Sequence, residues 1–279
     1  MTAWLPERWR AALAAALLIT SGSALVGPRV AQAEEGYALA PYSARYAIYR
    51  NGKLTGKVEV ALERHGERWI IRSEGSGTHG LARILSARDN EDVAGRLIDG
   101  RFRPDQYHRH TRVAGIDDRW TVDFDWERRR VSIMHDRGEP LLLDMSSPGI
   151  GDALDPLSLK LEMRYRLSGP EPLLQFQMGE EDEIDEQNFR ILAPERMETS
   201  LGCLSTLPVE KIRHGSTRYT RAWHAPDLAF VEVRVEHGKT DGNHLEMRIT
   251  ELSLDGAAIT PRPACAALQS SGATEDRPE

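Results

Sequence analysis

The chain has 279 residues, of which 40% are hydrophobic, 28% charged and 6% aromatic, so it is long enough for one large domain or two small ones. This composition excludes a chain that is disordered throughout, and 23 Gly and 2 Cys exclude a collagen-like chain and a disulfide-dense scaffold. A net charge of −7 argues against a protein that grips nucleic-acid phosphates, so we expect no nucleic-acid partner.

The N-terminal segment has the pattern of an export signal. Arg8 and Arg10 precede an apolar stretch from Ala11 to Ile19, and Ala31-Gln32-Ala33 places small residues where a signal peptidase cuts. The alternative is a membrane anchor, but the stretch is short for a span of about 20 residues. We therefore predict a signal peptide over residues 1–33, cleavage after Ala33, a periplasmic mature protein and no transmembrane span.

The two cysteines, Cys203 and Cys265, both lie in the predicted mature chain. In an oxidising compartment a bridge between them would close a loop of about 60 residues and tie the C-terminal segment to the body. Two unpaired thiols are the alternative. A metal pair is disfavoured because this spacing matches no zinc site.

The first half of the chain reads as a series of strands. Apolar and polar residues alternate from Tyr42 to Ile48, and Asn51-Gly52 then gives a two-residue hairpin signal before the next alternating run, Val58 to Leu62. A loop over 75–80 and a short helix over 81–85 interrupt the pattern. Later, Trp120, Val122, Phe124 and Trp126 share one face of a strand.

One segment has two interpretations. From Leu157 to Leu167 every second residue is apolar, which is the period of a strand, yet Leu, Lys, Glu, Met and Arg favour helix. Asp155 stands where an N-cap belongs and Pro156 where a first helical residue belongs. We therefore predict a helix near residues 155–167, with apolar stripes on two opposite sides.

The remainder returns to strands, at 173–178, 188–192, 207–213, 218–224, 229–237 and 244–254, with a solvated acidic loop at 180–186. Short strands with turns at regular spacing indicate a sandwich or barrel. The sequence thus predicts a mainly β fold: an antiparallel barrel or curved half-barrel with one central helix. One domain, residues 34–260, would be followed by a flexible tail over 261–279.

Three landmarks together resemble the exported bacterial proteins known as domain of unknown function 3108. They are the opening strand with Asn51-Gly52-Lys53, the segment Leu154-Asp155-Pro156-Leu157-Ser158, and Ala222-Trp223-His224-Ala225-Pro226-Asp227 followed by a strand from Val231. The likeness extends from about Tyr42 to Leu254. It implies an all-β, barrel-like envelope protein without an established activity, and it supplies no catalytic residues.

Metal binding is one candidate chemistry. His108 and His110 lie on one face of a predicted strand, about 7 Å apart, which suits some zinc sites. Further ligands would have to come from Asp123, Asp125 or His135. The alternative is a polar outer face with two solvated histidines. No cofactor is expected, and zinc is the exception to test.

Catalytic signals are generic. Asp117-Asp118 and the pair Asp123 and Asp125 offer paired carboxylates of the kind a glycoside hydrolase uses, but alternation puts the second pair opposite the tryptophan stripe. The chain contains no Gly-x-Ser-x-Gly elbow and no phosphate-binding glycine loop. These observations favour a protein that does not catalyse a reaction.

Four residues are candidates for ligand binding. Trp223, beside a Pro-Asp turn, could stack on a sugar or acyl chain while Asp227 orients it, or Trp223 could seal the barrel end while Asp227 closes a turn. Asp155 and Ser158, at the start of the predicted helix, complete the set. For Ser158, a hydrogen bond to backbone is the alternative role.

Taken together, the sequence favours a periplasmic binding, carrier or envelope-accessory protein for a lipid or polysaccharide-type ligand. The alternative is a metal-assisted hydrolase or lyase that acts on an envelope glycan through His108 and His110. A third hypothesis is an assembly protein whose edge strands dock another envelope component. The sequence names no ligand and no protein partner.

Overall fold

The computed structural model describes residues 39–136, 138–147, 152–169, 173–180, 183–240 and 242–266. All of them belong to one unit of the chain, Ala33–Glu279. The predicted signal peptide and residues 267–279 of the predicted tail lie outside the described residues. In the part of the chain that is described, no helix is both long enough and apolar enough to cross a bilayer.

Strands dominate the described residues. In chain order the elements are β1 (Tyr42–Arg50), β2 (Lys53–His65), β3 (Arg68–Gly77), α1 (Gly80–Ile84), β4 (Arg88–Ile98), β5 (Arg101–Val113), β6 (Ile116–Asp125), β7 (Arg130–His135), β8 (Leu141–Asp144), β9 (Ala153–Leu154), α2 (Pro156–Arg166), β10 (Leu173–Glu180), β11 (Glu183–Ile191), β12 (Glu195–Thr199), β13 (Gly202–Lys211), β14 (Arg218–Ala225), the 3-10 turn η2 (Pro226–Leu228), β15 (Val231–Lys239), β16 (His244–Leu254) and β17 (Ala257–Ala258).

The strands form one open sheet. From β8 back to β1 each strand pairs with the preceding one in the sequence, β1 then pairs with β16, and the sheet continues through β15, β14, β13, β11 and β10 to β9. Every pairing is antiparallel except that of β9 with β10. No pairing between described residues joins β8 to β9, so the sheet is not closed.

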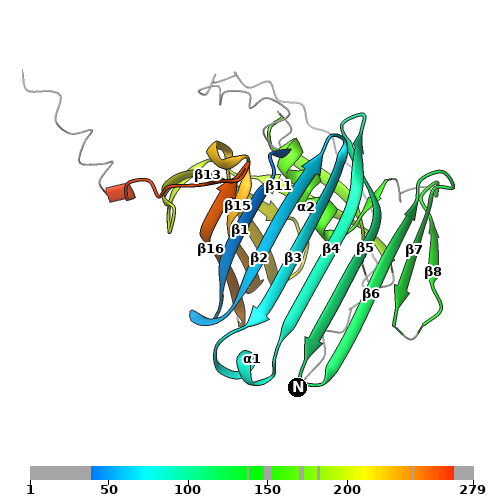
Figure 1. The fold of residues 1–279 in the computed structure, drawn as a ribbon, viewed down its shortest axis with the longest axis horizontal. Coiled ribbons are helices and arrows are strands. Elements are labelled where there is room, and N and C mark those ends of the chain that lie inside the picture. The colour runs from blue at the N-terminus through cyan, green and yellow to red at the C-terminus, as the bar shows by residue number, and fades with distance from the viewer. Residues whose placement is uncertain are drawn as a thin grey trace, which may run out of the picture. The chain divides into compact units, whose positions relative to one another are not determined.

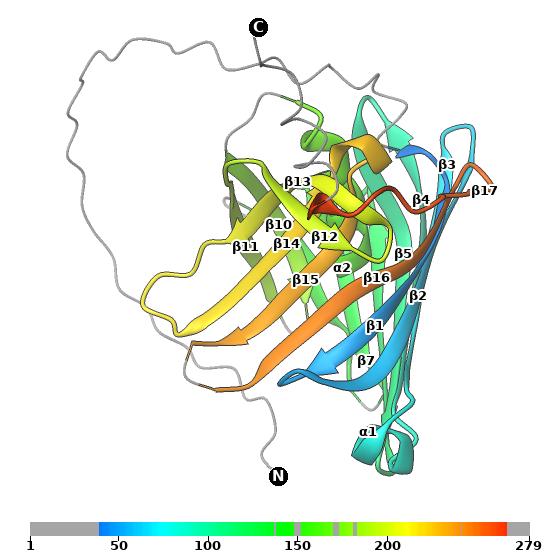
Figure 2. The same cartoon turned by 90° about the vertical axis from the view of Figure 1, so that its left-hand side faces the viewer.

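Helix α2 lies within the curve of this sheet. It packs against β3, β4 and β5 on one side and β9 and β10 on the other. Figure 1 shows β1 to β8 side by side, and Figure 2 shows the remaining strands turning round α2. The predicted mainly β fold, a curved antiparallel half-barrel with one central helix, is confirmed.

The helix begins where its sequence predicts. The Asp155 carboxylate accepts hydrogen bonds from the backbone N–H of Leu157 and of Ser158, each at 2.9 Å, and Pro156 occupies the first turn. The alternating apolar residues Leu157, Leu159, Leu161 and Met163 are all buried, although they face different sides of the helix. Apolar residues at every second position therefore reflect a helix that is buried on more than one side.

Two segments differ from the sequence prediction. Strand β3 continues to Gly77, where we expected a loop, and β11 begins at Glu183, so Asp185 and Glu186 lie in a strand and not in a loop. The glycines of β3 reflect close packing: a Cβ on Gly77 would lie 2.5 Å from the Ala82 carbonyl oxygen of α1. Small residues here mark the place where α1 meets the sheet.

A disulfide joins Cys203 and Cys265, 62 residues apart in the sequence. The C-terminal segment also pairs with the body through its backbone, because Cys203 N donates to Pro263 O at 3.0 Å and Arg262 N to Leu201 O at 2.8 Å. Residues 261–266, which the sequence analysis assigned to a flexible tail, are thus held against the start of β13.

Candidate ligand-binding cavity

A cavity of about 460 Å³ lies inside the curve of the sheet, between α1 and α2. Strands β1, β2 and β16 supply an apolar wall that includes Ile48, Val58, Val60 and Met247, and β3 supplies serines and glycines. Strands β4 and β5 supply a more polar wall, and α2 contributes Lys160. A cavity of roughly 300–1,000 Å³ is the usual size for a small-molecule site.

The side chains of the paired strands β2 and β3 become smaller toward the cavity. Going along β2 and β3 toward α1, the facing pairs are Leu62 with Ile71, Val60 with Ser73, Val58 with Gly75 and Gly56 with Gly77. The large pair, Leu62 and Ile71, is buried in the core, whereas Gly56, Val58, Gly75 and Gly77 line the cavity. The register of β2 on β3 therefore brings these small residues together on the cavity wall.

The two acids of the polar wall, Asp89 and Glu91, already accept hydrogen bonds from β5. The Arg109 guanidinium donates two hydrogen bonds of 3.0 Å to the Asp89 carboxylate, which also accepts from Thr111 Oγ1 at 2.7 Å. Burial disfavours the charge on Arg109, but Asp89 outweighs it and raises the pKa of the guanidinium. Tyr107 donates to Glu91 at 2.7 Å, and burial together with Glu91 raises the pKa of Tyr107.

Lys160 is the cation that α2 presents to the cavity. Its Nζ lies 3.6 Å from Glu232 Oε2, and its side chain is 40% exposed. Glu232 raises the pKa of Lys160 against the effect of burial. Burial alone would raise the pKa of Glu232, but Lys160, His224 and Arg164 together hold it below its ordinary value. Both partners therefore stay charged at neutral pH.

Behind this ion pair, two further polar groups hold the corner between β14 and β15. Arg164 is buried and donates to the Ala229 carbonyl through Nε at 3.1 Å and Nη2 at 2.9 Å, and its guanidinium lies 4.5 Å from the centre of the Tyr42 ring. His224 Nδ1 bonds the Phe230 carbonyl at 2.9 Å. Burial lowers the pKa of both Arg164 and His224.

Trp223 and Asp227, two of the predicted ligand-binding residues, do not line the cavity. Trp223 is buried, its indole N–H donates to Glu195, and the guanidinium of Arg234 lies 5.2 Å from its ring centre. The Asp227 side chain is 59% exposed and pairs with Arg262 at 3.0 Å. Trp223 is therefore enclosed by its own contacts, and Asp227 is joined to the C-terminal segment.

Asp155 and Ser158 have no exposed surface, so in this structure no ligand reaches them. Asp155 caps α2, and the Ser158 hydroxyl donates to its carboxylate. Burial is the main influence on Asp155 and raises its pKa to about 6, although the hydrogen bonds from Ser158 and Leu157 oppose that shift. The structure thus gives both residues a role in starting the helix.

His108 and His110 lie on β5 without a common ligand set. His110 Nε2 is 2.7 Å from Asp117 Oδ1, and His108 Nδ1 is 3.4 Å from Thr121 Oγ1. The further candidate donors have other contacts: Asp123 accepts from Gln106, and Asp125 pairs with Arg128. Among the described residues, no group of three His, Cys, Asp or Glu side chains is arranged to hold a metal ion.

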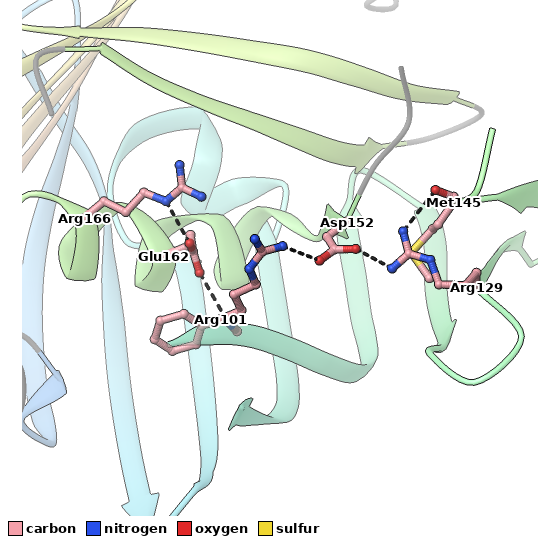
Figure 3. Close-up of polar contacts among 7 residues, drawn as sticks. Arg101, Arg129, Met145, Asp152, Glu162 and Arg166 are labelled. Atoms are coloured by element: carbon pink, nitrogen blue, oxygen red, sulfur yellow. Dashed lines mark hydrogen bonds and ion pairs between the residues drawn. The ribbon is translucent and has the colours of Figure 1, made fainter. Parts of the chain in front are cut away.

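A second, smaller cleft of about 250 Å³ is lined by charged and apolar residues, and Figure 3 shows polar contacts beside it. Glu162 of α2 accepts from Arg166 Nε at 2.9 Å and from the Phe102 backbone N–H at 3.2 Å. Asp152 accepts from Arg101 at 3.1 Å and from Arg129. Burial would raise the pKa of Asp152, but the two arginines lower it. These contacts fasten α2 and β9 to the sheet, and the two arginines keep the Asp152 carboxylate ionised at neutral pH.

Sequence reasoning missed the charged group at the inner end of the cavity. His224, which the sequence analysis names only as part of a motif, is fully buried. Lys160 and Arg164 stand four residues apart among the apolar positions of α2, and that spacing was the available signal, since it puts two cations on one helix face. Their partner Glu232 comes from β15, which no local pattern links to α2.

Comparison with known proteins shows the fold. No known family model matches the chain, and no curated protein does. A solved β-barrel-like protein of the domain of unknown function DUF1849, from Brucella abortus, is similar with a TM-score of 0.51 and 9% sequence identity, over 77% of this chain and 98% of that one. At such low identity the likeness concerns the β-barrel-like fold alone.

Two further solved structures match more weakly. One is a protein of Bacteroides fragilis described as exported and as having a YmcC-like fold, with a TM-score of 0.29 and 10% identity over 76% of this chain and 95% of that one. The other is described as a lipoprotein of Parabacteroides distasonis, with a TM-score of 0.29 and 10% identity over 77% of this chain and 95% of that one.

Proposed function

We propose that this protein is an exported, non-catalytic carrier of the cell envelope that holds a lipid-type amphipathic ligand in the cavity between α1 and α2. The predicted signal peptide and the resemblance to domain of unknown function 3108 belong to this proposal. The observation that carries it is the cavity itself, which has an apolar wall on β1, β2 and β16 and a polar wall on β4 and β5 whose acids already accept hydrogen bonds.

The lining favours a lipid over a polysaccharide. An acyl chain needs apolar surface without directional bonds, and Val58, Val60 and Met247 provide it. A sugar needs stacking rings and available hydrogen-bonding groups, but no aromatic residue is among the described residues that line this cavity. Its acids Asp89 and Glu91 already accept hydrogen bonds from Arg109 and Tyr107. A ligand with a chain and one polar end fits both walls.

The test is the binding of a dansyl-labelled fatty acid, measured as the increase in dansyl fluorescence. Val58→Phe places a larger side chain in the cavity and is expected to weaken binding at least ten-fold. Val235→Phe, on a half-buried valine of β15 that does not line the cavity, is the matched control and should bind as the wild type does. Wild-type protein that binds no probe, or equal binding by the Val58→Phe variant, would contradict the proposal.

A further inference from the structure

Apolar side chains are exposed on the turns that surround the open end of the cavity. On α1, Leu81 is 67% and Ile84 is 77% exposed, and Ile116 at the start of β6 is 60% exposed. Leu54 at the start of β2 and Leu245 at the start of β16 are exposed as well. We call these five residues the apolar rim.

Backbone hydrogen bonds hold the segments of the apolar rim together at one end of the sheet. Thr78 N, before α1, donates to Thr55 O at 2.9 Å, and Ala114 N, in the β5–β6 turn, donates to Leu85 O at 3.1 Å. Asn51 N donates to His244 O at 2.8 Å and so joins the β1–β2 turn to β16. Figure 1 shows α1 at the edge of the sheet where β3 ends and β4 begins. Thr55, Ala82 and Leu245 from these segments also line the cavity.

The charge of this end is opposite to that of the chain. Residues 49–57 and 76–88 contain no Asp or Glu, whereas the whole chain carries −7. Their basic residues are Arg50, Lys53, Lys57, Arg83 and Arg88. The acids at the start of the neighbouring strand β6 are Asp117, which pairs with Arg112, Arg119 and His110, and Asp118. Basic residues among exposed apolar ones are the pattern of a surface that contacts anionic lipid.

We infer that this end of the protein docks on an anionic lipid bilayer, with Leu81 and Ile84 entering the surface and the basic residues beside them contacting lipid headgroups. Docking would turn the open end of the cavity toward the lipid. Charge complementarity points to a membrane and not to a protein partner, because the exposed apolar side chains stand on separate turns with cations between them. The inference goes beyond the proposed function, since docking does not require an occupied cavity.

The experiment is co-sedimentation of the purified protein with vesicles. One set is an equimolar mixture of phosphatidylglycerol and phosphatidylcholine, and the other is phosphatidylcholine alone. We expect sedimentation with the anionic vesicles, little with the neutral ones, and a loss of binding as salt screens the headgroup charge. A protein that sediments with neither set, or equally with both, overturns the inference.

The variant Leu81→Asp/Ile84→Asp is expected to lower the bound fraction at least ten-fold. Leu142→Asp/Leu173→Asp makes the same chemical change at exposed leucines of β8 and β10, away from α1, and should bind as the wild type does. Equal binding by the rim variant and the wild type overturns the inference. Circular dichroism melts establish that both variants are folded.

Two further variants test the role of the basic residues without introducing aspartate into the apolar rim. Arg50→Gln/Arg83→Gln should weaken binding to anionic vesicles, while Arg68→Gln/Arg128→Gln, at turns on the opposite end of the sheet, should not. The Val58→Phe variant should dock as the wild type does even where it has lost the fatty-acid probe. Docking and ligand binding can therefore fail separately, which distinguishes this inference from the proposed function.

Discussion

Arg164 is a cation in the apolar interior, and its two hydrogen bonds explain its position. They end on the carbonyl of Ala229, which together with Phe230 adopts a left-handed backbone conformation, each with φ near 54°. Neither residue is glycine, so each conformation costs about 1–2 kcal/mol. Arg164 and His224 fasten the two carbonyls, and this lets the chain turn sharply from β14 into β15.

Replacing Arg164 by Met keeps most of the side-chain volume but leaves the Ala229 carbonyl buried without its donor. We expect Arg164→Met to lower the free energy of unfolding by about 2–4 kcal/mol, measured by urea denaturation. Arg128→Met removes an exposed arginine that pairs with Asp125 and should change stability by no more than about 0.5 kcal/mol. If both variants unfold at the same urea concentration, Arg164 does not hold the corner.

At the scale of elements, local sequence patterns predicted those turns and helix ends whose structure depends on residues close together in the chain. The Asn51-Gly52 turn, with φ of 50° and 75°, joins β1 to β2 as predicted, and the Asp155–Pro156 start decided between helix and strand for the segment that followed. Alternation also placed Trp120 and Val122 inside. Each of these features depends on neighbours in the sequence.

The cavity could not be predicted in the same way. On its wall Val58 faces Gly75 and Gly56 faces Gly77, and this register depends on the pairing of two whole strands. The same holds for Lys160, whose partner Glu232 lies on a strand far along the chain. The predicted ligand-binding pair Trp223 and Asp227 was chosen from a local motif. The burial of a charged group and the position of a cavity both depend on residues that are far apart in the sequence, so no local motif reveals them.

The buried cap of α2 makes the stability of this element depend on pH. The pKa of Asp155 rises from 3.8 to about 6 on folding, so the folded state binds a proton more tightly than the unfolded chain does. Asp155 therefore contributes most below about pH 4, and that contribution is lost as the pH rises to about 6. The shift corresponds to about 3 kcal/mol.

Asp155→Asn should remove this contribution, because an amide does not titrate and its oxygen can still accept from the backbone N–H groups of Leu157 and Ser158. Urea denaturation at several pH values should show the wild type losing stability relative to the variant between about pH 4 and pH 6, with a constant difference above. Parallel stability curves for the two proteins across this range would show that Asp155 has an ordinary pKa in the folded state.

At the scale of the whole described unit, the cavity and the apolar rim depend on the same framework. The sheet supplies the walls, α2 closes the inner end, and the disulfide between Cys203 and Cys265 with the backbone pairing of Pro263 holds the C-terminal segment to β13. The rim surrounds the opposite opening. Because Val58 lies in the cavity wall and Leu81 and Ile84 lie on the rim, substitutions there test ligand binding and docking separately.

Ligand binding to this framework should raise its stability by mass action, since the unfolded chain has no cavity. Palmitate at about 100 times its dissociation constant, and below its micelle concentration, should stabilise the folded protein by about 2.7 kcal/mol. For a chain of this size that is a rise of roughly 5–10 °C in the melting temperature, measured by circular dichroism. Val58→Phe should lose the rise, because its cavity is filled, and Leu81→Asp/Ile84→Asp should keep it, because its cavity is intact. A rise that persists in the Val58→Phe variant would place the ligand elsewhere on the protein.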